Sequence, residues 1–84
     1  MELGKGLKTI EYGVFYDCSG LKDLTIPENV TVIGKEAFRE CKALTLIKFD
    51  GTKNRWDGIV KKDYWDYGMV TYTVKCIDGN TTKK

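Results

Sequence analysis

The stretch that decides the fold is residues 24–49, LTIPENVTVIGKEAFRECKALTLIKF. When the chain is shifted by 23 positions, the apolar residues of this stretch fall on apolar residues that precede them. Eight pairs coincide in this way: Leu3 with Ile26, Leu7 with Val30, Ile10 with Ile33, Phe15 with Phe38, Cys18 with Cys41, Leu21 with Leu44, Leu24 with Ile47 and Ile26 with Phe49. Units of this length cannot bury an apolar face alone, so they stack on one another around a shared core.

Each unit is predicted to contribute one short strand and one turn of helix. Residues 24–26 and 47–49 alternate inward and outward positions with period two, as strands do, and Pro27 ends the first of them. Residues 34–41 place apolar side chains on one face at helical spacing, and residues 12–18 are their counterpart one unit earlier. A repeat length in the twenties is typical of leucine-rich solenoids. The predicted fold is therefore α/β: a short solenoid of about two repeats with a parallel sheet and a C-terminal cap.

The segment after residue 49 breaks the pattern and is predicted to close the array. Adding 23 to Ile47 and Phe49 gives Val70 and Tyr72, so residues 69–76 are expected to form a third strand. Its inward side chains would be Val70, Tyr72, Val74 and Cys76. Residues 53–62 suit a short helix that presents Trp56, Ile59 and Val60 to the end of the core, followed by an aromatic loop at residues 64–68. The organisation expected is one domain, residues 1–80, with repeats in 1–49, a cap in 50–80 and a disordered tail in 81–84.

These residues resemble the BspA-like leucine-rich repeats of bacterial surface proteins. The second unit carries the hallmark as Ile33-Gly34, Ala37-Phe38, Cys41, Leu44 and Ile47, preceded by Leu24, Ile26 and Pro27. The first unit departs from it, because Glu11 stands in place of the glycine and Val14 in place of the alanine. The segment after Phe49 is similar to the one that commonly closes such arrays. The resemblance implies adhesion and protein contact, with no catalytic residues to carry over.

Composition excludes several other classes of function. The chain has 84 residues, a formal net charge of +2 and no histidine. A net charge this small leaves no basic surface for nucleic acid, so we expect no nucleic-acid partner. Without histidine the chain lacks the commonest general base and the commonest metal ligand, so we expect no enzymatic activity and no cofactor. Cys18, Cys41 and Cys76 are an odd number without metal-ligand spacing. Reduced buried thiols are the favoured interpretation, with a redox or metal site at Cys18 and Cys41 as the alternative.

The sequence also bears on location. It shows no signal peptide and no apolar run long enough to cross a membrane, so no membrane partner is expected. The chain as given would be cytoplasmic, whereas the family resemblance implies the cell surface or secretion if the chain is cut from a longer parent.

Three surfaces are candidates for binding a protein. The first is the outward face of the stacked strands, expected to comprise Asp23, Thr25, Leu46, Lys48, Met69, Thr71 and Thr73. The second is the aromatic loop with Tyr64, Trp65 and Tyr67, whose other interpretation is a shield over the last unit. The third is the N-terminal end, where Leu3, Leu7 and Ile10 begin a unit with nothing stacked before it, so residues 1–15 are predicted to self-associate or to dock further repeats.

The leading hypothesis is a non-enzymatic protein-interaction module of leucine-rich repeat type. One alternative is a compact, phage-borne inhibitor of an intracellular enzyme or defence complex, suggested by the short chain with an initiating methionine. Another is a carbohydrate-binding or adhesion module that uses the aromatic loop.

Overall fold

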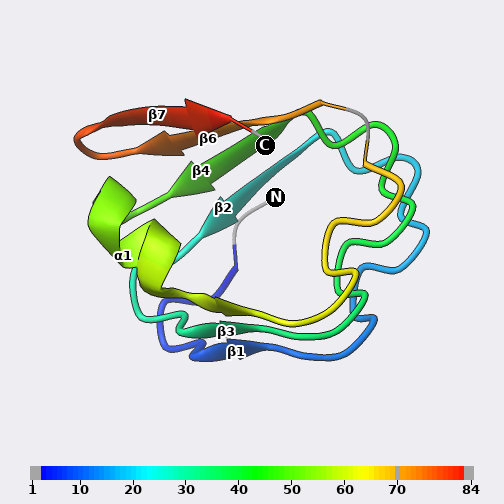
Figure 1. Cartoon of the computed structure of the whole chain (residues 1–84), viewed down its shortest axis with the longest axis horizontal. Helices are drawn as coiled ribbons and strands as arrows, with labels where there is room; N and C mark the ends of the chain where they lie inside the picture. The colour runs from blue at the N-terminus through cyan, green and yellow to red at the C-terminus, as the bar shows by residue number, and fades with distance from the viewer. Residues whose placement is uncertain (1–2, 70, 83–84) are drawn as a thin grey trace.

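The chain runs repeatedly around the same three-sided path (Figure 1). A computed structural model describes residues 3–69 and 71–82. The described elements are β1 (Thr9–Ile10), β2 (Asp23–Ile26), β3 (Val32–Ile33), β4 (Leu46–Phe49), α1 (Lys53–Gly58), β5 (Val60–Lys61), β6 (Thr73–Cys76) and β7 (Gly79–Thr82). One side of the path is a four-stranded sheet in the order β2-β4-β6-β7, here sheet A, and the second side is a three-stranded sheet in the order β1-β3-β5, here sheet B. The third side consists of turns.

The first two circuits stack with the predicted register. In sheet A, β2 pairs in parallel with β4, and Leu24 lies beside Ile47, its counterpart in the next repeat. In sheet B, β1 pairs in parallel with β3 at the same separation, since Ile10 lies beside Ile33. The strands predicted at residues 24–26 and 47–49 are thus confirmed. Sheet B was not predicted, because its strands are too short to show an alternation of their own.

The turn side is not helical, so the predicted helices at residues 12–18 and 34–41 are wrong. Glu36 and Glu40 have φ of 57° and 63°, which no α-helix allows. The physical reason is that the backbone N–H groups of this side donate their hydrogen bonds to another circuit. The N–H groups of Gly13, Phe15 and Asp17 donate to the carbonyls of Lys35, Ala37 and Arg39 in the next circuit, over 2.7 to 3.1 Å. A helix would use these donors internally, whereas here they tie neighbouring circuits together.

The third circuit is longer than the second, which shifts the register. Val32 pairs with Val60, and Leu46 pairs with Thr73. In each pair, more residues separate the two partners than the length of one repeat. The predicted third strand at residues 69–76 is therefore wrong in length and register: β6 begins at Thr73 and places Val74 beside Ile47. Tyr72 is buried but precedes β6. Val70 lies outside the described residues.

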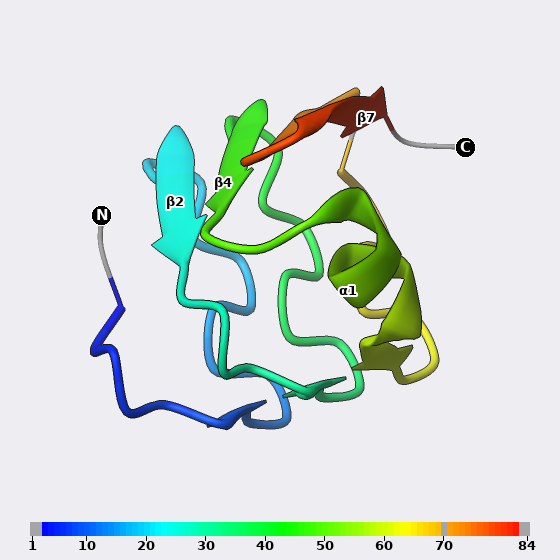
Figure 2. The ribbon, with the colours of Figure 1, turned by 90° about the vertical axis from the view of Figure 1, so that its left-hand side faces the viewer.

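The extra residues of the third circuit form α1 (Figure 2). The side chain of Thr52 caps this helix by accepting a hydrogen bond from the N–H of Arg55 at 3.2 Å. Trp56 and Ile59 are buried as predicted, with the Trp56 ring 5.5 Å from that of Phe49. Val60 is 52% exposed, so its predicted place against the core is wrong.

The hairpin of β6 and β7 ends the described chain. Thr81 pairs with Val74 and Thr82 with Thr73 in an antiparallel ladder. A disordered tail from residue 81 is therefore wrong for Thr81 and Thr82, while residues 83–84 lie outside the described part. The core enclosed by the two sheets and the turns is formed by the apolar residues that the repeat identifies, among them Ile10, Leu24, Ile26, Val30, Ile33, Phe38, Leu44, Ile47 and Phe49.

Candidate interaction surfaces

The outer face of sheet A carries five of the residues predicted for it: Asp23, Thr25, Leu46, Lys48 and Thr73. Asp23 and Lys48 are exposed, and Thr25 and Leu46 are half-buried. The register places Asp23 beside Leu46 and Thr25 beside Lys48. These five side chains come from three neighbouring strands, as predicted, and their role in binding stays a prediction.

Two other predicted members of this face do not belong to it. Met69 is only 3% exposed and packs in the core, and Thr71 is exposed but precedes β6 in an irregular segment. The cause is the lengthened third circuit, which brings Thr73 and Lys75 beside Leu46 and Lys48 instead.

The three side chains of the predicted aromatic loop separate into one that packs against the core and two that are exposed. The Trp65 ring turns inward and meets the rings of Phe38, Trp56 and Tyr72 at centroid distances of 5.9 to 6.1 Å. It is therefore partly buried and packs against the core. Tyr64 and Tyr67 remain 58% and 50% exposed, with their rings in a T-shaped arrangement at 5.8 Å.

Tyr64 and Tyr67 are part of a larger surface on the turn side. Exposed tyrosines of the first circuit lie on the same side of the molecule, and the guanidinium of Arg39 from the second circuit lies between the first and third circuits. We call these residues the tyrosine surface: Tyr12, Tyr16, Arg39, Tyr64 and Tyr67. Sequence reasoning missed Tyr12, Tyr16 and Arg39, although the repeat shift that places Tyr16 on Arg39 could have found the last two.

Arg39 organises the tyrosine surface. Its guanidinium carbon lies 5.7 Å from the centroid of the Tyr16 ring and 4.8 Å from that of Tyr67, so it bridges the first and third circuits. It also pairs with the carboxylate of Glu36, which is 8% exposed and accepts a hydrogen bond from the Tyr12 hydroxyl at 2.9 Å. The hydrogen bonds from Arg39 and then Tyr12 lower the pKa of Glu36, and the bond to Glu36 raises the pKa of Tyr12. An ion pair and a hydrogen bond, both made by Glu36, therefore hold Arg39 and Tyr12 in place.

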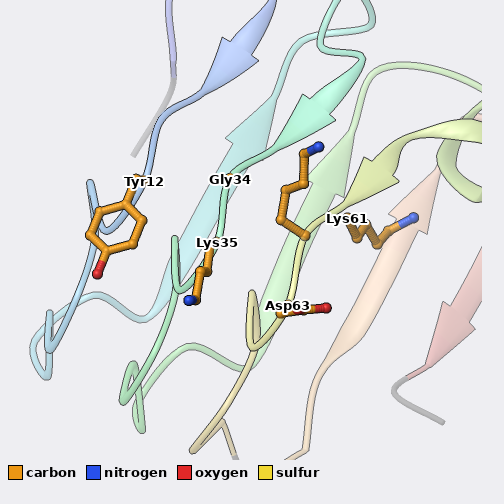
Figure 3. A pocket seen from close by; sticks show the side chains of 6 residues that line it. Tyr12, Gly34, Lys35, Lys61 and Asp63 are labelled. Atoms are coloured by element: carbon orange, nitrogen blue, oxygen red, sulfur yellow. The ribbon is translucent and has the colours of Figure 1, made fainter.

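Beside the tyrosine surface lies an open groove of about 480 Å³ (Figure 3). Tyr12, Lys35 and Asp63 stand in a row along it, one from each circuit. The Lys61 ammonium is engaged, since it donates to the carbonyl of Trp56 at 2.6 Å and lies 4.6 Å from the centroid of the Trp56 ring. The groove thus adjoins the tyrosine surface at Tyr12, which belongs to both.

The N-terminal face of the first circuit is apolar. Leu3 and Leu7 are half-buried against the core and line a shallow depression of about 120 Å³ together with Val14 and Phe15. β1 is an edge strand of sheet B. Self-association through residues 1–15 stays a prediction.

The cysteines lie at different depths. Cys41 and Cys76 are buried, Cys18 is half-buried, and all three are free thiols. The Cys41 thiol donates to the carbonyl of Phe15 at 2.9 Å, and burial raises its pKa. Among the residues that the structure describes, no group of three or more Cys, Asp or Glu side chains is placed to hold a metal ion, and no helix has the length and apolarity to span a bilayer.

Comparison with known proteins gives one match. The family model described as "BspA type Leucine rich repeat region (6 copies)" matches residues 1–58. Comparisons with curated proteins and with solved structures gave no significant match. The matched region ends at Gly58, the last residue of α1.

Proposed function

The chain belongs to the BspA-type leucine-rich repeat family, and we propose that it is a non-enzymatic protein-interaction module whose tyrosine surface contacts the partner. Repeats of this family point to a protein-interaction or adhesion module, which leaves the binding surface to be inferred. In this proposal the stacked circuits are a short leucine-rich repeat solenoid that serves as a rigid frame.

The observation that carries the proposal is the composition of the tyrosine surface. Tyrosine and arginine are enriched among the residues that dominate protein interfaces, because they combine a large contact area with a polar group. Four tyrosines, each about half exposed or more, gather around Arg39 on one side of a small molecule. Isolated exposed apolar residues are ordinary, but a cluster of this kind is typical of an interaction site.

The fixed geometry of the surface supports the same function. Arg39 is held between two rings and paired with Glu36, so its side chain is already ordered before a partner arrives. Ordering such a side chain at an interface costs about 0.5–1.5 kcal/mol, and a preorganised surface avoids part of that cost. Glycan binding by the aromatic loop draws less support, because Trp65 packs against the core and leaves only two of the three predicted rings well exposed.

The test is affinity capture from extracts of the cells that make the protein, with mass spectrometry as the readout. The variants Tyr64→Ala and Tyr67→Ala each remove an exposed ring that is not needed by the core. Ile77→Ser is the matched control, because Ile77 is 71% exposed and lies outside the tyrosine surface. A stoichiometric protein that is retained by the wild type and the control but lost by both tyrosine variants supports the proposal. Equal retention by all four proteins would place the contact elsewhere.

A further inference from the structure

Two lysines stand directly opposite each other on the outer face of sheet A. β4 and β6 pair in parallel with Lys48 beside Lys75. Both side chains are exposed, and the described residues form no ion pair with either of them. Like charges at directly opposite positions of neighbouring strands destabilise a sheet.

Uncharged side chains that can donate hydrogen bonds flank the two lysines on the outer strands of the sheet. Thr25 lies beside Lys48 on one side, and Asn80 lies beside Lys75 on the other. We call this line of four residues, one from each strand of sheet A, the lysine row: Thr25, Lys48, Lys75 and Asn80. Each member can donate a hydrogen bond and none carries a negative charge. Adjacent strands are about 4.8 Å apart, so the row is about 14 Å long.

We propose that the lysine row docks an acidic helical segment of a protein partner. Carboxylates complement the two unpaired ammonium groups and remove their mutual repulsion. Glutamates three or four residues apart on a helix are separated by about 5–6 Å, which matches the strand spacing between Lys48 and Lys75. Two lysines are too few to follow a nucleic-acid backbone, and the formal net charge of the chain is only +2. This surface is distinct from the tyrosine surface, so its failure would leave the proposed function standing.

The binding test uses a fluorescein-labelled, alanine-rich helical peptide with glutamate pairs at positions i and i+4, and a control peptide with glutamine at those positions. Fluorescence anisotropy is measured with the wild type, Lys48→Gln, Lys75→Gln and Lys62→Gln. Lys62 is an exposed lysine away from sheet A, so its variant has the same net charge as the other two. The proposal predicts binding of the glutamate peptide only, weakened about threefold by Lys48→Gln or Lys75→Gln, unchanged by Lys62→Gln and reduced by salt.

A second readout concerns the free protein. Lys48→Gln and Lys75→Gln are each expected to raise the melting temperature, because either change removes the repulsion, whereas Lys62→Gln should leave it unchanged. Equal weakening by all three substitutions, absence of peptide binding, a lower melting temperature for the row variants, or tighter binding of a heparin oligosaccharide than of the glutamate peptide would each overturn the proposal.

Discussion

The rings of Phe15 and Phe38 lie parallel, with 5.4 Å between centroids and 4° between planes, although one full repeat separates them in the chain. They are equivalent positions of two stacked circuits, but their surroundings differ. Phe38 is fully buried between Phe15 on one side and the edge of Trp65 on the other, whereas Phe15 is 8% exposed and lies on the N-terminal face.

The first prediction follows from this difference. Phe38→Leu should lower the free energy of unfolding by roughly 1–2 kcal/mol, because it leaves a space between two ordered rings. Phe15→Leu should cost less, since that ring borders the open depression on the N-terminal face and its surroundings can adjust. Urea unfolding of both variants, followed by fluorescence, measures the difference. A larger loss for Phe15→Leu would mean that the N-terminal face is covered in solution.

The second prediction concerns Gly34, where the backbones of two circuits approach closely. A Cβ at position 34 would lie 2.7 Å from the Glu11 carbonyl carbon and from the Tyr12 nitrogen, both of which are backbone atoms. Gly34→Ala must therefore separate the first two circuits, at a cost of about 1–3 kcal/mol. Gly20→Ala is the control, because nothing lies within 4 Å of its added Cβ, and it should be neutral or slightly stabilising. Thermal melts that rank the two variants the other way would contradict this packing.

The repeat pattern was sufficient to predict β2, β4 and their partnership. It could not predict the register of β6, because nothing local indicates that the residues of α1 are additional to the circuit. Val70 and Tyr72 suit an inward strand position as well as Val74 and Cys76 do. The turn side was misread for a related reason: Ala37, Phe38 and Cys41 share one face both in a helix and in the observed turns. Only the cross-circuit hydrogen bonds separate the two, and these depend on a neighbouring circuit.

The same limit applies to the candidate surfaces. Tyr64 and Tyr67 are close in sequence, so a local search found them, whereas Tyr12 and Arg39 join them only after three circuits have stacked. Likewise the opposition of Lys48 and Lys75 depends on the lengthened connection between β4 and β6. The repeat length of the first two circuits would place Thr71, not Lys75, beside Lys48. Surface residues of a stacked fold can thus be predicted only as well as the register is known.

The third prediction is an acid sensitivity centred on Glu36. Its pKa is lower in the folded protein than its ordinary value of 4.5, so the folded state favours the charged form. This contribution to stability is present above the ordinary pKa and is lost as the pH falls through the lower, folded value. Tyr12→Phe removes one of the hydrogen bonds that hold the carboxylate, so it should move the acid unfolding midpoint to higher pH. Circular dichroism across the acid range measures the midpoint, and identical acid curves for wild type and Tyr12→Phe would show that the bond does not persist in solution.

The fourth prediction distinguishes reduced thiols in the stacked circuits from a disulfide bond between neighbouring circuits. In the native protein Cys18 should react first with a disulfide reagent, because it is half-buried, while burial shields Cys41 and Cys76 and raises the pKa of each thiol. After denaturation without reductant all three thiols should react. Cys18→Ser serves as the control and should remove only the fast native phase. A titration that yields a single thiol in the denatured wild type would instead mean that two circuits are joined covalently, and the hydrogen bond from the Cys41 thiol to the Phe15 carbonyl could not form.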